Sequence, residues 1–171
     1  PMPQKPYKQT RNGTLFHSWV EARFGQEHLA DDLDSADSLP VEFDLESIKQ
    51  LQANFEASRW ASLKPLEIER EIQLTIEGNT FICKLDAVFA TESGVEIIDW
   101  KTGKRPKNPA DEELRALQLA LYRLAYSRFS GLPLEKIEAS FYFVADDVEV
   151  KPQKLLNEQE LLELWRKTIS N

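Results

Sequence analysis

The spacing of apolar residues along the chain changes from a helical period to an alternating one and then back. Over residues 13–24 and 44–60 apolar positions recur every three or four residues, which predicts two helices with one buried face each. From Ile68 to Ile76 apolar residues fall on alternate positions, a period that predicts a β-strand. The chain is therefore expected to begin with helices and to continue into a sheet.

Short polar turns divide the region after the helices into three consecutive strands. The strand near Ile68 is followed by predicted strands over 80–89 and 95–101, with tight turns at 77–79 and 91–94. Strands joined by such short turns pair with their neighbours in antiparallel fashion. We therefore expect a three-strand meander in which the second and third strands lie side by side.

The helical period returns in the second half of the chain. A long helix is predicted over 111–129, with a buried stripe that runs from Leu114 to Leu124. Residues 137–145 read as a fourth strand, and residues 148–152 as a short fifth one.

A capping box opens one more helix near the end. Asn157 is followed three residues later by Glu160, a spacing in which each side chain bonds to the other residue's main chain. The order αβββαβ predicts an α/β fold, a mixed sheet flanked by helices. We interpret residues 1–12 as an N-terminal tail, residues 27–38 as an exposed acidic loop or a weak helix, and residues 13–171 as a single domain.

Composition narrows the classes of function. One cysteine, Cys83, excludes a disulfide framework, a four-cysteine zinc site and an iron–sulfur cluster held by four cysteines. No stretch approaches the ~20 consecutive apolar residues of a membrane span, so we expect a cytoplasmic protein with no membrane partner. The net charge of −8 disfavours a protein that coats nucleic acid. It does not exclude an enzyme with a locally basic site.

The candidate chemistry lies at the ends of the second and third predicted strands. Asp99 and Lys101 are two residues apart and share one strand face, whereas Trp100 points into the packing. Asp86 adds a carboxylate from the neighbouring strand, and two carboxylates with an ammonium suit a hard cation beside a phosphate. An isolated Asp-x-Lys is more often a surface ion pair. Here Asp99 follows two apolar residues in a predicted central strand, where an unpartnered carboxylate is costly.

Four motifs accompany these residues in a fixed order. They are residues 13–17, which end in His17; residues 84–89, around Asp86; residues 98–104, which contain Asp99-x-Lys101; and residues 118–122, from Gln118 to Tyr122. In this order they resemble the PD-(D/E)XK nuclease superfamily, and within it the RecB-like nuclease domains fused to Superfamily 1 DNA helicases. The resemblance spans about residues 13–143 and implies a restriction-endonuclease-like core.

The resemblance implies a metal-dependent deoxyribonuclease that hydrolyses phosphodiester bonds with Mg2+ or Mn2+. Asp86, Asp99 and His17 are its implied metal ligands, with the backbone carbonyl of Trp100 as a further one. Lys101 is implied to position or activate the attacking water and to stabilise the developing charge. An imidazole ligand beside carboxylates also makes a site tolerant of manganese.

Further residues have supporting roles in this interpretation. Gln118 and Tyr122 lie one helical turn apart, so both can face the site and orient the DNA strand or the lysine. Thr102, Lys104 and Arg105 follow the third strand and are expected to contact phosphates flanking the cleaved bond.

Two positions depart from the clear pattern. Glu69 is a weaker candidate for supporting the metal, since it could also line the solvent face of its strand. Cys83 stands three residues before Asp86, where the family usually has glycine. As a nucleophile Cys83 is disfavoured, because no histidine motif partners it and burial suppresses the thiolate.

The helicase-linked resemblance also implies a biological setting. The domain is expected to be the C-terminal part of a helicase-nuclease that acts in DNA repair or recombination, cutting single-stranded DNA as an exonuclease or endonuclease. Its implied partners are DNA and a helicase motor, in the same chain or another. The main alternative is a catalytically inactive nuclease-like domain that binds DNA or holds a helicase together. A second alternative is a plain α/β scaffold in which Asp99 and Lys101 merely pair.

Overall fold

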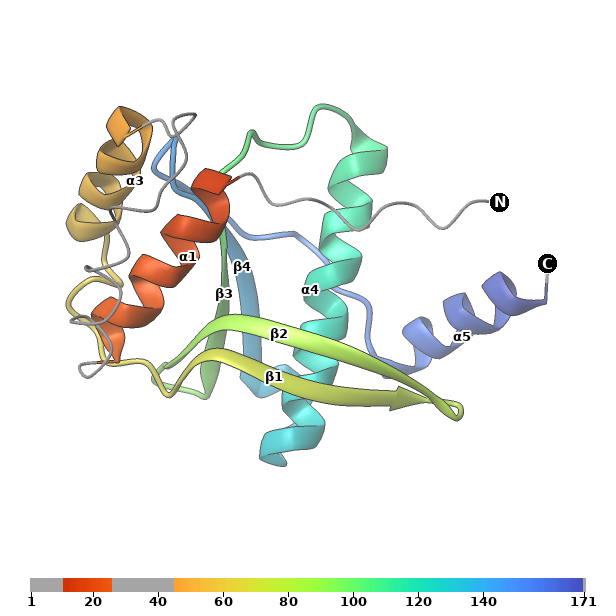
Figure 1. The fold of residues 1–171 in the computed structure, drawn as a ribbon. Helices are drawn as coiled ribbons and strands as arrows, with labels where there is room; N and C mark the ends of the chain where they lie inside the picture. The colour runs from red at the N-terminus through yellow and green to blue at the C-terminus, as the bar shows by residue number, and fades with distance from the viewer. Residues whose placement is uncertain (1–10, 26–44, 171) are drawn as a thin grey trace.

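The structure is a computed structural model that describes residues 11–25 and 45–170 (Figure 1). The last two residues of the expected tail, 1–12, begin the first helix, and the rest of that tail lies outside the described residues. The expected acidic loop, 27–38, and Asp44 at the start of the second predicted helix also lie outside them.

The elements occur in the predicted αβββαβ order, followed by a short strand and a closing helix. They are α1 (Arg11–Phe24), α3 (Leu45–Ala57), β1 (Glu67–Ile76), β2 (Asn79–Ala90), β3 (Val95–Lys101), α4 (Pro109–Ser130), the 3-10 helix η2 (Leu134–Lys136), β4 (Ile137–Phe143), β5 (Val148–Val150) and α5 (Glu158–Ile169). The predicted helices and strands are confirmed, with ends shifted by a few residues at most. Within the described ranges, no helix is both long enough and apolar enough to cross a membrane.

The strands form one mixed sheet in the order β1-β2-β3-β4-β5. β1, β2 and β3 make the predicted antiparallel meander, β3 pairs with β4 in parallel, and β5 is an antiparallel edge strand. A parallel pair requires a crossover connection, which α4 supplies. β3 is the central strand, and Ile97 and Ile98 within it are fully buried.

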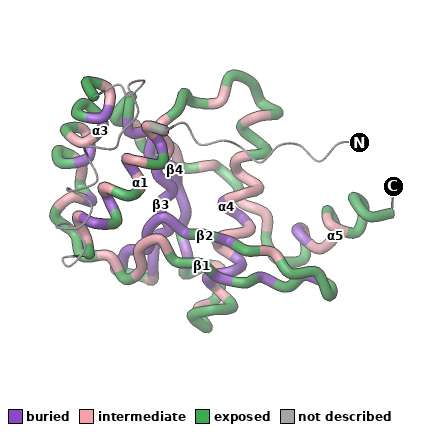
Figure 2. Tube along the Cα trace, viewed as in Figure 1, coloured by how far each residue is buried: buried purple, intermediate pink, exposed green. Residues whose placement is uncertain are grey.

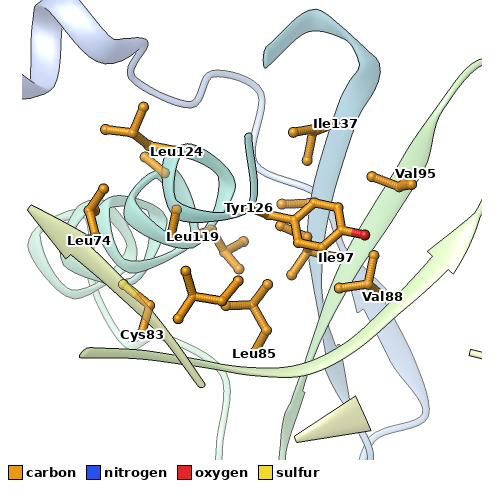
Figure 3. Close-up of a cluster of buried hydrophobic side chains, with 14 of the residues drawn as sticks. Leu74, Cys83, Leu85, Val88, Val95, Ile97, Leu119, Leu124, Tyr126 and Ile137 are labelled. Atoms are coloured by element: carbon orange, nitrogen blue, oxygen red, sulfur yellow. The ribbon is translucent and has the colours of Figure 1, made fainter. Parts of the chain in front are cut away.

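Helices cover both faces of the sheet and create two hydrophobic cores. α4 packs on one face, where Leu119 meets Leu85 and Ile97 (Figure 3). α1 and α3 lie on the other side of the sheet (Figure 1), where Phe55 packs edge-to-face against Trp100. The central strands are therefore buried from both sides, as the purple tube of β3 and β4 in Figure 2 shows.

The buried face of α4 differs from the predicted stripe. Leu114, expected in that stripe, is 65% exposed, whereas Leu119 is fully buried. The buried residues of α4 begin only at Leu119, so the first turns of the helix extend beyond the core. The period of a helix identifies an apolar face, but the length of the sheet beneath it decides how much of that face is covered.

The closing helix begins as predicted. The Glu160 main-chain N–H donates to Asn157 Oδ1 at 2.9 Å, and the Asn157 N–H donates to Glu160 Oε1 at 3.2 Å, which completes the capping box. α5 is attached to the α4 side through the buried Leu161 and through Trp165, whose ring packs edge-to-face on Phe81 of β2. Most of its remaining surface is exposed (Figure 2).

Candidate active site

An irregularity in β2 places Asp86 at the site. Cys83 and Leu85 pack in the core beneath α4, whereas Ala87 and Phe89 pack in the core beneath α1 and α3. In a regular strand these four odd-numbered residues would all face one side of the sheet. The alternation therefore slips by one residue at Asp86, which the sequence pattern of this strand did not reveal.

The matching place in β1 is also irregular. Ile68 pairs with Ala87 and Arg70 pairs with Leu85, so Glu69 lies opposite Asp86 on the neighbouring strand. Glu69 has a φ of 47°, in the left-handed region that costs a residue with a Cβ about 1–2 kcal/mol. Such backbone persists only where the surroundings hold it, and it clusters at functional sites. Its side chain is only 7% exposed.

β2 and β3 separate at the same point. Their pairing ends with Ala87 and Ile98, so Asp86 and Asp99 are the first residues beyond the shared ladder. Trp100 still pairs with Tyr142 of β4, but where the pairing with β2 has ended its main-chain N–H donates to Asp86 Oδ2 at 2.8 Å. The fork between the two strands thus holds both carboxylates, which are 7% and 4% exposed.

A cavity of about 590 Å3 opens over this fork and is lined by every site residue that the sequence singled out. These are His17, Glu69, Asp86, Asp99, Trp100, Lys101, Thr102, Lys104, Arg105, Gln118 and Tyr122. The indole of Trp100 packs on Phe55 and Trp60 in the opposite core, so its main chain is the part that faces the cavity. The structure thus brings the four sequence motifs together.

His17 lies between two carboxylates. Its Nδ1 is 3.3 Å from Asp86 Oδ1 and 3.4 Å from Glu69 Oε1. Burial opposes protonation of the ring, but hydrogen bonds to Asp86 and Glu69 and their negative charges outweigh it and raise the pKa of His17 to about 10. Burial and the nearby charge of Asp99 raise the pKa of Asp86 as well, against the opposing effect of His17. Without a cation, the cluster therefore holds extra protons.

The donor set suits a divalent cation. One ligand atom each from His17, Glu69 and Asp86 lies within 4.8 Å of the others. Asp99 adds a third carboxylate to the same cavity, and its buried Oδ2 forms an ion pair with Lys101 Nζ at 2.9 Å. Three carboxylates and one imidazole match the preferences of Mg2+ and Mn2+, and a cation would compensate the adjacent buried charges.

Lys101 is held at the cavity by a chain of polar contacts. Its Nζ lies 2.9 Å from Asp99 Oδ2 and donates to Gln118 Oε1 at 3.2 Å. Gln118 Nε2 in turn donates to the Tyr122 hydroxyl at 2.9 Å. Burial and the charges of Asp99 and Asp86 raise the pKa of Tyr122, so its hydroxyl stays neutral. The helical spacing of Gln118 and Tyr122 thus orients the ammonium that the strand presents.

Basic residues surround the mouth of the cavity, and three of them, Lys84, Lys107 and Arg115, were not among the predicted site residues. Lys84 lines the cavity and pairs with Glu69 at 3.2 Å, and Arg115 lines it and donates to the Lys104 carbonyl at 3.3 Å. Both lie on the expected faces: Lys84 is two residues before Asp86, and Arg115 is three before Gln118. Spacing relative to the motifs was therefore an available signal.

Cys83 takes no part in the cavity lining. Its side chain is buried between the sheet and α4 (Figure 3), and burial raises the pKa of its thiol. At position 83 the side chain points into the core on the α4 side and away from the cavity. A cysteine is therefore accommodated where the family usually has glycine.

Comparison with known proteins agrees with this geometry. The sequence model of the PD-(D/E)XK nuclease superfamily matches residues 2–171, and the chain belongs to this superfamily. Its five-stranded mixed sheet flanked by helices is consistent with the restriction-endonuclease-like core that the motifs implied. No protein of curated function matched the sequence.

Two solved structures resemble the chain at low sequence identity, and the first shows the same fold. A crystal structure of a protein from Eubacterium rectale, provisionally named an exonuclease, has a TM-score of 0.55 and 14% identity, covering 95% of this chain and 65% of that chain. A structure of SSO0001 has a TM-score of 0.43 and 17% identity, covering 90% of this chain and 70% of that chain. The chain thus spans 65% of the length of the first structure, and the likeness to it concerns the fold alone.

Proposed function

We propose that this domain is a divalent-metal-dependent deoxyribonuclease that hydrolyses phosphodiester bonds. The proposal rests on one observation. Asp86, Asp99 and Lys101 line the same cavity, at the point where β2 and β3 separate. Membership of the nuclease superfamily supports the same chemistry. A plain scaffold would not require two buried carboxylates side by side, because burying two groups of the same charge together is costly.

The metal ligands in this proposal are Asp86, Asp99 and His17, with Glu69 and the Trp100 carbonyl beside them. The contacts of His17 with Asp86 and Glu69, and the buried Asp99 carboxylate in the same cavity, support this assignment. When bound, Mg2+ or Mn2+ supplies Lewis-acid stabilisation of the phosphate and lowers the pKa of a coordinated water.

Lys101 is the catalytic residue that the protein itself aims at the reacting phosphate. Its ammonium can hold the attacking water in line and stabilise the negative charge that develops on the phosphate oxygens. Gln118 fixes that ammonium through its amide oxygen, and Tyr122 fixes the orientation of the amide. The ammonium also forms an ion pair with Asp99, so it is held between the Gln118 amide and the Asp99 carboxylate.

The rim of the cavity is proposed to bind the DNA backbone on either side of the cleaved bond. Thr102, Lys104 and Arg105 belong to the loop after β3 and line the cavity. Arg115 holds this loop by donating a hydrogen bond to the Lys104 carbonyl. Contacts to phosphates position a strand without reading its sequence, so we propose cutting with no sequence preference. The cluster of positive charge offsets the net charge of −8 where the substrate binds.

The helicase-linked motifs support a finer proposal about context. We place the activity beside a helicase motor that delivers single-stranded DNA during cytoplasmic DNA repair or recombination.

The test is cleavage of single-stranded DNA with Mn2+ or Mg2+ by the parent domain and by Asp99→Asn and Lys101→Ala. Each substitution is expected to lower the rate by about 100-fold or more, because each removes a group acting at the transition state. Circular dichroism checks that the variants are folded. Glu46→Gln and Lys49→Ala, on the exposed side of α3, are the matched controls.

Two outcomes contradict the proposal. A purified parent domain that cuts no DNA with either metal, even at high protein concentration, supports the inactive alternative. Variants of Asp99 and Lys101 that cut as fast as the parent place the chemistry elsewhere.

A further inference from the structure

A second cavity, of about 790 Å3, lies next to the site cavity. It runs between the first half of α4 and the β4–β5 edge of the sheet. Arg105 and Arg115 line both cavities, and their carboxylate partners are Asp146 at 3.5 Å and Asp111 at 3.4 Å. A linear polymer bound in the site cavity can therefore extend past these two arginines into the second cavity.

The lining of the second cavity combines an apolar floor with a basic margin. The accessible apolar surface of this floor comes from the half-buried Val150 and Pro152, whereas Phe141 and Phe143 lie beneath it and are only 3% and 0% exposed. The margin carries four basic and two acidic side chains, although the whole chain has a net charge of −8. The basic side chains are Arg105, Arg115, Lys151 and Lys154, and the acidic ones are Glu112 and Glu113.

The two lysines that line only the second cavity are available to an anion. Lys151 Nζ lies 2.9 Å from Glu138, and Lys154 Nζ lies 2.9 Å from Glu160, but their side chains are 57% and 72% exposed. Exposed ion pairs contribute little, so an approaching phosphate can replace or share these partners at small cost. The position of each lysine is set by its carboxylate rather than by burial.

We propose that the second cavity binds the part of a single nucleic-acid strand that continues from the cleaved phosphate. Lys151 and Lys154 contact its backbone, and its unpaired bases lie on the apolar floor. This proposal rests on the proposed function, because it takes the site cavity to hold the cleaved bond. A single strand fits better than a duplex, whose bases are paired and cannot contact an apolar floor.

Salt dependence of binding is the direct test. The affinity of the parent domain and of the double variant Lys151→Ala/Lys154→Ala for a fluorescent single-stranded oligonucleotide is measured in EDTA over a range of salt. Each phosphate contact to a single strand contributes about 0.7 to the slope of log affinity against log salt. The double variant is therefore expected to have a slope shallower by about 1.4 and an affinity about tenfold lower at low salt.

The matched control is Lys49→Ala/Lys167→Ala, which removes the same charge from exposed positions on α3 and α5 that line neither cavity. It is expected to keep the parental slope. A second arm measures cleavage, where Lys151→Ala/Lys154→Ala should raise KM for a long oligonucleotide with little change in kcat. A dinucleotide, too short to span both cavities, should be cut equally by parent and variant.

The outcomes separate this inference from the proposed function. If the parent cuts DNA but Lys151→Ala/Lys154→Ala keeps its slope and its KM, the second cavity is not a strand site and the nuclease proposal stands. If no protein cuts DNA while the slope falls as stated, the strand site stands and the nuclease proposal fails. A loss that is equal for the Lys49→Ala/Lys167→Ala control, or that appears only with duplex DNA, overturns the inference.

Discussion

At the scale of single residues, His17 and the carboxylates around it form a group in which protons and a cation compete. Asp86 and Glu69 raise the pKa of His17, whereas burial and Asp99 raise the pKa of Asp86 against the opposing effect of His17. Metal ligation requires a neutral imidazole and ionised carboxylates. Protons must therefore leave the cluster before a cation enters.

This competition predicts the pH dependence of stability in the metal-free protein. The pKa of His17 is raised from 6.5 to about 10, so the stability it contributes is complete below its unfolded pKa and is lost as pH rises through about 10. The raised pKa of Asp86 acts in the same direction, because its ionisation in the folded state is unfavourable. In EDTA the melting temperature should therefore fall between about pH 7 and pH 10.

The control for this prediction is His17→Asn, which removes the titrating ring but keeps a polar side chain. Its melting temperature should change less over the same range. Added Mn2+ should stabilise the parent more as pH rises, since fewer protons then compete with it. A parent and a variant with parallel pH curves would show that His17 does not carry the effect.

At the scale of elements, the site depends on a paired defect in the β1–β2 ribbon. The side-chain alternation of β2 slips at Asp86, and the residue opposite, Glu69, has left-handed backbone. Together they turn two carboxylates towards α1, while the strands on either side of the defect continue into separate cores. A regular ribbon would have buried or exposed both residues with their neighbours.

The strained backbone predicts an unusual order of stability. At position 69, glycine should be more stable than alanine by about 1 kcal/mol, because only glycine adopts a φ of 47° without a Cβ clash. Urea denaturation of Glu69→Gly and Glu69→Ala in EDTA measures the difference. Both variants lose the carboxylate, so its electrostatic effects cancel.

Gln73 provides the control in the same strand. It is exposed, and its φ is not positive. There Gln73→Gly should be less stable than Gln73→Ala, the usual order in a strand. If Glu69→Ala is as stable as Glu69→Gly, the left-handed backbone at this position is not a feature of the folded protein.

At the scale of the whole molecule, the site joins side chains from both faces of the sheet. α1 contributes His17, β2 and β3 contribute the aspartates, and α4 contributes Gln118 and Tyr122. α1 packs on α3 through Phe16 of α1 and the fully buried Phe55 of α3, whose ring centroids are 6.1 Å apart. The aromatic core beneath α1 and α3 is therefore what holds the histidine over the strands.

This arrangement predicts that two core substitutions of similar cost will differ in metal binding. Phe55→Ala should lower the free energy of unfolding by about 3–5 kcal/mol and Leu161→Ala by about 2–5 kcal/mol, since both side chains are buried. Only Phe55→Ala loosens α1, so only it should weaken Mn2+ binding measured by calorimetry. Equal loss of Mn2+ affinity in both variants would mean that general destabilisation, not the position of His17, sets the affinity.

Much of the fold could be predicted from the sequence because it depends on local periods. Alternating and helical spacings predicted the order of elements, and the Asn157–Glu160 pair predicted the start of the last helix. The predicted candidate residues all line one cavity, because short turns and the i,i+4 spacing of Gln118 and Tyr122 constrain their neighbours. The roles of these residues stay predictions until the variants are measured.

What the sequence alone determined was the identity and order of the groups, since these follow from spacing within each element. What only the tertiary structure decided was where regular spacing breaks: the slip at Asp86, the left-handed backbone of Glu69 and the exposed first turns of α4 around Leu114. These depend on contacts between segments far apart in the chain. The apolar periodicity of one strand gives no information about which strand and helix pack against it in the folded protein.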